Sequence, residues 1–145
     1  MKSKEEILKL EHQVCFPIYT LSKEIVSMYR PYLDELDISY PQYLVLMVLW
    51  EEQQATVSMI CEKLYLDTGT ITPMLKRMEA KELIARTRQK NDERVVQITL
   101  TQKGKDLKKK AINIPYKLLE DIDLTQEELV FLRSITTKIL KKSNK

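Results

Sequence analysis

The sequence predicts a mainly α-helical fold that carries one small β-hairpin. The 145 residues include only 2 glycines and 5 prolines, and 43% are hydrophobic, which suits a single helical domain with its own core. Apolar residues recur at the helical period of about 3.6 along most of the chain, whereas residues 84–100 alternate with a period of about two. The hairpin is therefore expected between two sets of helices.

The first 38 residues are expected to be helical. Ser3 and Glu6 have the spacing of a capping box, in which each side chain accepts a hydrogen bond from the other residue's backbone N–H. Apolar residues continue at helical spacing to Tyr29, and Pro17 either kinks this helix or stands at the first position of a new one. Pro31 is expected to end or bend it.

A second capping box, Ser39 with Gln42, opens the next predicted helix. From Tyr43 to Trp50 this helix is apolar on nearly every side. A helix without a polar face has no surface for water, so it should lie at the centre of the core.

Residues 56–80 predict two helices joined by a short turn. Thr56 is a plausible N-cap of the first, and the second should begin between Asp67 and Thr72. Pro73 is tolerable only near the start of a helix, because it lacks an N–H and crowds the preceding turn. The inner face of the second helix is apolar and comprises Ile71, Met74, Leu75 and Met78. Its outer face comprises Thr72, Pro73, Lys76 and Arg77. Hydroxyl groups and cations on one face suit a helix that lies in the DNA major groove.

Two short strands follow, within Ile84–Arg88 and Val96–Leu100, with a polar loop between them. Helix, turn, helix and hairpin in this order predict a winged helix-turn-helix, whose cationic wing can reach the minor groove or the DNA backbone. A solvated surface hairpin is the alternative interpretation. Asp67 is expected to be structural, pairing with Arg77 or Arg94. The candidate DNA-contacting residues are Thr68, Thr70, Thr72, Pro73, Lys76, Arg77, Arg86, Lys90, Asp92 and Arg94.

The positive charge is concentrated on the predicted DNA-reading half. The whole chain carries a net charge of +3, yet residues 67–110 contain 12 Lys and Arg against 6 Asp and Glu. Such an asymmetry is typical of a surface that binds phosphates.

Composition argues against several other classes of protein. No apolar run approaches the roughly 18 residues that a membrane span needs, and no signal peptide is visible, so we expect a cytoplasmic protein that does not bind membranes. Two cysteines and one histidine, His12, predict neither a disulfide framework nor a metal site. No cofactor is expected. A thiol peroxidase or other enzyme is disfavoured, because no catalytic set or phosphate-binding loop is present.

The C-terminal part, residues 102–145, predicts further helices. Thr101 can cap one, Pro115 marks a break, and Thr125 with Glu128 forms a third capping box. The terminal helices, in residues 1–38 and 102–145, carry more apolar surface than one domain should need, so we expect them to form a homodimer. Residues 39–101 would read the DNA within a single domain of 145 residues. Two reading helices about one DNA turn apart predict a pseudo-palindromic operator.

Several strings resemble the MarR family of transcriptional regulators, and within it the organic-hydroperoxide-sensing (OhrR-like) branch and its MgrA- and SarZ-like relatives. The strings are LYLDTGTITPMLKRME at residues 64–79, NDER at 91–94, LTQKG at 100–104, QVCF at 13–16 and SYPQY at 39–43. The resemblance covers nearly the whole chain and implies a dimeric DNA-binding repressor.

The resemblance also implies a redox switch at Cys15. Two tyrosine hydroxyls from the partner subunit, those of Tyr29 and Tyr40, would hold the thiolate. Peroxides react with thiolates rather than thiols, and hydroxyl donors stabilise a thiolate by charge-assisted hydrogen bonds. An organic hydroperoxide would form a sulfenic acid, and a small thiol would then form a mixed disulfide. Cys61 is expected to be a buried structural thiol, and no cysteine follows it to form an internal disulfide.

Three alternatives stay open at this point. Cys15 could be an inert core thiol, since free cysteines are among the most buried residues. The regulator could instead respond to a small aromatic ligand that binds without covalent chemistry. It could also be a global virulence or stress regulator that senses oxidants.

Overall fold

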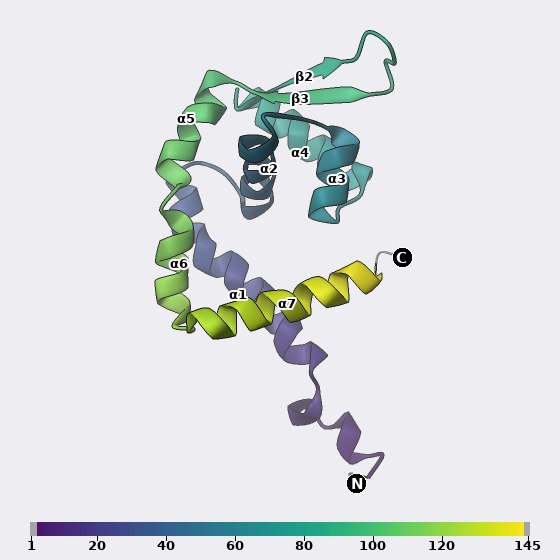
Figure 1. Cartoon of the computed structure of the whole chain (residues 1–145), viewed down its shortest axis with the longest axis vertical. Coiled ribbons are helices and arrows are strands. Elements are labelled where there is room, and N and C mark those ends of the chain that lie inside the picture. The colour runs from purple at the N-terminus through teal and green to yellow at the C-terminus, as the bar shows by residue number, and fades with distance from the viewer. Residues whose placement is uncertain (1–2, 144–145) are drawn as a thin grey trace. The chain divides into compact units, whose positions relative to one another are not determined.

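The computed structural model describes residues 3–143 (Figure 1). The elements in chain order are the 3-10 turns η1 (Glu6–Leu8) and η2 (Leu10–His12), α1 (Cys15–Asp34), α2 (Tyr40–Glu52), β1 (Gln54–Thr56), α3 (Val57–Leu64), α4 (Thr68–Ala80), β2 (Ile84–Arg88), β3 (Val96–Leu100), α5 (Gln102–Ala111), α6 (Ile114–Ile122) and α7 (Gln126–Ser143). The chain forms two compact units, Met1–Ile112 and Asn113–Lys145. The predicted mainly helical fold with a β-hairpin is confirmed.

Helix α2 forms the centre of the first unit, as its apolar sequence predicts. Val45, Leu46 and Leu49 have no exposed surface. The predicted capping box begins the helix: the backbone N–H of Gln42 donates to Ser39 Oγ at 3.4 Å, and that of Ser39 donates to Gln42 Oε1 at 3.1 Å.

The N-terminal segment differs from the prediction. The capping box of Ser3 and Glu6 forms, but it opens only the single turn η1. The long helix α1 begins at Cys15, and Pro17 is its third residue. Backbone N–H groups in the first turn of a helix have no helical acceptor, so the N–H that proline lacks costs little there. Pro31 lies inside α1 and does not end it.

The sheet has three antiparallel strands in the order β1-β3-β2, and the hairpin β2–β3 lies across the ends of α2 and α4 (Figure 1). Both strands of the hairpin were predicted, whereas β1 was not. Three residues are too few to show an alternating pattern, and only pairing with β3 makes them a strand. Ile98, fully buried in β3, stands opposite Ala55 on one side and Arg86 on the other.

Helices α3 and α4 begin at the predicted caps. Thr56 Oγ1 accepts from the backbone N–H of Met59 at 3.1 Å, and Asp67 caps α4. Pro73 differs from the expectation, because it is the sixth residue of α4 and lies outside the first turn. Its missing N–H leaves the carbonyl of Gly69 without a helical donor, and Gly69 is exposed, so water can satisfy that oxygen.

The start of α5 is bound tightly to the winged region. Thr101 caps the helix at the N–H of Gly104, 3.1 Å away, and the indole N–H of Trp50 donates to the carbonyl oxygen of Gly104 at 2.9 Å. A Cβ at position 104 would overlap the carbonyl oxygen of Leu83. Helix α5 therefore belongs to the first unit, and the segment 102–145 expected to dimerise is divided after Ile112.

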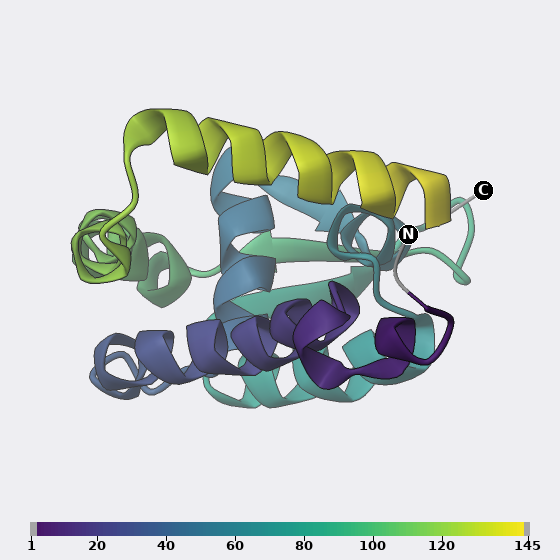
Figure 2. The same ribbon diagram turned by 90° about the horizontal axis from the view of Figure 1, so that it is seen from below.

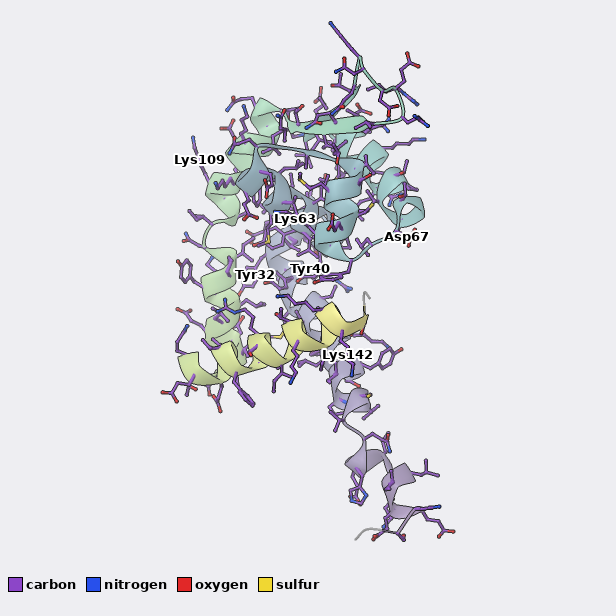
Figure 3. The ribbon with its side chains drawn as sticks, turned by 45° about the vertical axis from the view of Figure 1, so that its right-hand side comes forward. Tyr32, Tyr40, Lys63, Asp67, Lys109 and Lys142 are labelled. Carbon is purple, nitrogen blue, oxygen red and sulfur yellow. The ribbon has the colours of Figure 1, made fainter. Side chains whose placement is uncertain are left out.

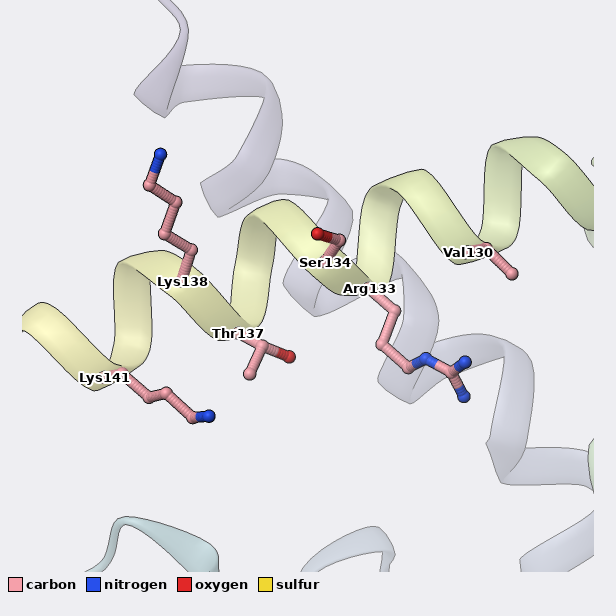
Figure 4. Close-up of a pocket in the computed structure, with 6 residues that line it drawn as sticks. All are labelled: Val130, Arg133, Ser134, Thr137, Lys138 and Lys141. Atoms are coloured by element: carbon pink, nitrogen blue, oxygen red, sulfur yellow. The ribbon is translucent and has the colours of Figure 1, made fainter.

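The second unit contains α6 and α7. Pro115 stands in the first turn of α6, as the predicted break requires, and the predicted capping box of Thr125 and Glu128 precedes α7. Figure 2 shows α7 as one uninterrupted helix. None of its described residues is buried. One face is polar and basic and lines a groove with Val130, Arg133, Ser134, Thr137, Lys138 and Lys141 (Figure 4). Exposed apolar side chains lie elsewhere on α7: Phe131, Leu132, Ile135, Ile139 and Leu140.

Substitution of Gly104 by alanine should destabilise the first unit. The added methyl group meets a backbone carbonyl that cannot move without disturbing the turn before β2, and overpacking of this kind costs about 1–3 kcal/mol. Urea unfolding of Gly104→Ala measures the loss. The exposed neighbour Lys105→Ala should stay within about 0.5 kcal/mol of the wild type. Equal stabilities of the two variants would contradict the packing argument.

Candidate nucleic-acid interface and cysteine site

Helix α4 presents five of the predicted contact residues to solvent. Its inner face is buried, as predicted, through Ile71, Met74, Leu75 and Met78. Exposed on the helix are Thr68, Thr70, Pro73, Lys76 and Arg77, whereas Thr72 is half-buried. The two faces separate cleanly, so α4 offers hydroxyl groups and cations on one side of a rigidly packed helix.

Asp67 is structural, but it does not pair with Arg77 or Arg94 as expected. Its carboxylate accepts from the backbone N–H of Thr70 at 2.8 Å and from the Thr70 hydroxyl at 2.9 Å. Both hydrogen bonds lower the pKa of Asp67 below its usual value, and the bond from the Thr70 hydroxyl has the larger effect. Figure 3 shows Asp67 at the turn before α4. The carboxylate therefore fixes the first turn of the outward-facing helix.

The tip of the wing is ordered by its own hydrogen bonds. Asp92 Oδ1 accepts from the backbone N–H of Arg94 at 3.1 Å and from Arg94 Nε at 3.2 Å. Arg88 Nη1 donates to the carbonyl oxygen of Glu93 at 2.9 Å. The side chain of Arg94 is 92% exposed, so it is accessible on the wing surface. Asp92 orients this cation, while Lys90 is exposed nearby.

Arg86 has a carboxylate partner that sequence reasoning missed. Glu79, near the end of α4, accepts from Arg86 Nε at 2.9 Å and from the backbone N–H of Arg86 at 3.2 Å. The hydrogen bond from the Arg86 side chain, more than any other influence, lowers the pKa of Glu79. Periodicity cannot reveal this pair, because one residue lies on a helix and the other on a strand.

A groove of about 200 Å³ lies between α3, α4 and the wing. It brings together four of the predicted DNA-contacting residues, Thr68, Thr72, Arg86 and Arg94. Thr56 and Ser58 line the same groove from the start of α3. Hydroxyl groups and guanidinium groups therefore converge in one concavity on the surface predicted to meet DNA.

The structure does not bring Cys15 together with the two predicted tyrosines in one protomer. Cys15 is exposed and is the first residue of α1, beside the positive end of the helix dipole. Tyr29 follows 14 residues later on the same helix, which places the two Cα atoms about 21 Å apart. No tyrosine side chain spans that distance.

The tyrosines themselves form a cluster. The ring centroids of Tyr29 and Tyr40 lie 4.7 Å apart, and Tyr43, only 3% exposed, lies 5.8 Å from Tyr29 and 6.3 Å from Tyr40. Burial, with the neighbouring Tyr40 and Tyr43, raises the pKa of Tyr29 to about 12. Burial also raises the pKa of Tyr40. Both hydroxyls are therefore protonated at neutral pH and able to donate; Figure 3 labels Tyr40 at the start of α2.

Cys61 is half-buried, which differs from the expected buried thiol. Its neighbour Ile60 takes the fully buried position on α3. The sulfur of Cys61 lies 4.0 Å from Thr68 Oγ1, at the start of α4. The predicted apolar stripe nevertheless faces inward, because Ile60 is buried and Val57, Cys61 and Leu64 are half-buried, while the other residues of α3 are exposed.

Two comparisons of the sequence decide the family. Residues 27–111 match the model of the family described as "Transcriptional regulator SarA/Rot". The chain is 48% identical to the organic hydroperoxide resistance transcriptional regulator of Bacillus subtilis (strain 168), over 97% of this chain and 95% of that protein. The chain belongs to the SarA/Rot and MarR-type family of transcriptional regulators. The expectation of a regulator rather than an enzyme is thereby confirmed.

Further relatives of this regulator support the assignment. The HTH-type transcriptional regulator SarZ of Staphylococcus saprophyticus is 38% identical, over 92% of this chain and 91% of that protein. The structure of reduced AbfR bound to DNA matches with a TM-score of 0.82 and 33% identity, over 99% of this chain and 100% of that one. AbfR, from Staphylococcus epidermidis, is also known in overoxidized and disulfide forms, with TM-scores of 0.77 and 0.63.

Within residues 3–143, no helix combines the length and the apolar character needed to cross a lipid bilayer.

Substitution of Asp67 should test the cap of α4. Asp67→Ala removes the acceptor and should lower the melting temperature, whereas Asp67→Asn keeps an acceptor oxygen and should lose less. Because folding lowers the pKa of this carboxyl, its contribution is present above the unfolded value of about 3.9 and lost as pH falls through the folded value. The difference in melting temperature between wild type and Asp67→Ala should therefore be full at pH 7 and shrink below pH 4. A difference independent of pH would contradict this.

Proposed function

We propose that this protein is a homodimeric repressor that releases its operator when an organic hydroperoxide oxidises Cys15. The observation that carries the proposal is the exposed position of Cys15 at the first turn of α1, in a chain so similar to an organic hydroperoxide resistance regulator. An exposed thiol at the first turn of a helix is accessible to a peroxide.

A second copy of the chain would complete the sensing site. The hydroxyls of Tyr29 and Tyr40 cannot reach the cysteine of their own protomer, but they are protonated and clustered where a partner's sulfur could receive their hydrogen bonds. The terminal regions, 1–38 and 102–145, are proposed to dimerise around residues 39–101. Exposed apolar side chains support this: Ile7, Leu8, Leu10, Val14, Phe16 and Ile18 near the N-terminus, and those of α7.

The oxidation is a simple displacement. The Cys15 thiolate attacks the terminal oxygen of the hydroperoxide; an S–O bond forms, the O–O bond breaks, and the alkoxide leaves and takes a proton from water to become the alcohol. A small external thiol then forms an S–S bond with the sulfenic acid and releases water. Cys61 lies in the reading motif, far along the chain, so an external thiol is the proposed resolving partner.

Binding to DNA would use both parts of the winged region. The outer face of α4 fits the major groove, and Arg94 at the wing reaches the minor groove or a phosphate. A two-fold dimer places the two reading helices about 34 Å apart, which requires a pseudo-palindromic operator. Bulk added at Cys15 would break the contacts with the tyrosine hydroxyls, shift one protomer against the other and misplace the reading helices.

Cys15→Ser should keep DNA binding and lose the response to oxidant. The operator probe is a labelled duplex selected by the wild-type protein from a randomised library. Cumene hydroperoxide should weaken wild-type binding by about 5- to 150-fold, the usual range of coupling between two sites, and leave Cys15→Ser unchanged. Cys61→Ser is the matched control and should respond like the wild type. Intact mass should show added oxygen, or a bound thiol, only where Cys15 is present; release of Cys15→Ser by the hydroperoxide would refute the proposal.

A second candidate function rests on a groove of about 220 Å³ beside the tyrosines. Val26, Leu33 and Pro41 contribute apolar walls, Arg30 and Asp34 contribute charges of opposite sign, and Tyr40 contributes a hydroxyl, which suits a small aromatic molecule with a polar substituent such as a carboxylate beside Arg30. This alternative predicts that benzoate releases Cys15→Ser from the operator probe. The redox proposal predicts no such release.

Arg94→Ala should weaken binding of the operator probe. Loss of one phosphate- or base-contacting cation is expected to cost about tenfold and to reduce the slope of log affinity against log salt by about one. Lys108→Ala, which removes an equal charge from the exposed face of α5, is the control. Equal affinities of Arg94→Ala and Lys108→Ala at matched salt would exclude the wing from the interface.

A further inference from the structure

Glu79 is a carboxylate within the proposed DNA-binding region that no contact with DNA explains. It lies two residues after Arg77 on α4, and its side chain is 39% exposed. A negative charge this close to bound DNA repels phosphates. The residue therefore weakens binding unless it contributes something else.

Both oxygens of Glu79 hold the same residue of the wing. Oε2 accepts from the Arg86 side chain and Oε1 from the Arg86 backbone N–H. The first bond fixes the guanidinium group, and the second fixes the position of strand β2 itself. Charge-assisted bonds in pairs impose both direction and distance, and the Arg86 side chain is only 27% exposed, which limits screening by solvent.

The position of Arg86 along the hairpin makes this contact important. Ile84, at the start of β2, is buried, whereas Thr87, Arg88 and the residues that follow to Asn91 are exposed. Arg86 is thus the last residue of β2 with a half-buried side chain before the wing tip. Farther out, only Val95 and Val96 of the opposite strand are half-buried against the groove, and no side chain of β2 beyond Arg86 is shielded. Arg94 lies in this outer part, and the two bonds to Glu79 are the innermost polar contacts that tie it to α4.

We infer that Glu79 is a positioning residue for DNA binding, which sets the wing, and with it Arg94, at a fixed distance and angle from the reading helix. The inference rests on the proposed function, in which α4 and the wing both contact DNA. Glu79 keeps these two elements at the spacing that simultaneous contact requires. The groove lined by Thr72, Arg86 and Arg94 is the space whose shape this contact sets.

Charge and positioning predict opposite signs for Glu79→Gln. If the carboxylate acted only through its charge, its removal would strengthen binding to every duplex. If it positions the wing, Glu79→Gln should weaken binding of the operator probe by about three- to tenfold and should not weaken binding of a scrambled duplex of equal composition. Glu62→Gln is the matched control, because it removes an exposed carboxylate from α3 of the same motif without breaking such a contact.

A double-mutant cycle with Arg94→Ala tests whether the effect passes through the wing. In the Arg94→Ala background the wing has lost its main contact, so Glu79→Gln should cause little further loss on the operator probe. Thermal unfolding of each variant separates weakened binding from a failure to fold; if Glu79→Gln is unfolded, Glu79→Asp, which keeps the charge but shortens the reach, replaces it with the same expectation.

The outcomes divide clearly between the two proposals. Full additivity of the two substitutions, unchanged affinity of Glu79→Gln, or tighter binding by it would overturn the positioning role while leaving operator binding intact. If the wild type selects no duplex, or if Arg94→Ala binds as the wild type does, the proposed wing contact fails first and the inference falls with it.

Discussion

Helix α2 is buried on nearly every side, and this single constraint organises the first unit. A helix with no polar face must be covered all round, so α1, α3, the sheet and α5 pack against it. Its first residues, Tyr40 and Tyr43, belong to the tyrosine cluster, and its later residue Trp50 bonds to Gly104 at the start of α5. One rigid element thus joins the proposed sensing region to the base of the DNA-reading region.

Carboxylates shape the DNA-reading surface although DNA itself is an anion. Asp67 caps α4, Asp92 orients Arg94, and Glu79 holds Arg86. Each contributes through hydrogen bonds to its own protein, and the excess of cations keeps the region positive overall. The surface therefore combines fixed geometry with electrostatic attraction, two properties that cations alone would not provide.

The features that the sequence predicted well are local ones. Ser39, Thr56, Asp67, Thr101 and Thr125 all cap helices, because a cap needs only residues within one turn. Features that depend on distant partners were missed. Strand β1 forms only by pairing with β3, and the pair of Glu79 and Arg86 joins a helix to a strand. Pro73 differed for a local reason, because its sixth position in α4 is tolerated where the unpaired carbonyl of Gly69 is exposed. The role of Cys15 was predicted from a resemblance to a family. Its distance from Tyr29 could not be predicted, because it depends on both residues lying on one continuous helix, α1.

The absence of buried residues along described α7 has a thermodynamic consequence. A helix of 18 residues with apolar side chains in water gains too little from its own hydrogen bonds to be strongly stable. Under the proposed association its order comes from another chain, so folding of this segment and assembly become one equilibrium. The fraction of protein that is folded and dimeric then rises with protein concentration, and dilution favours the dissociated chain with α7 unfolded.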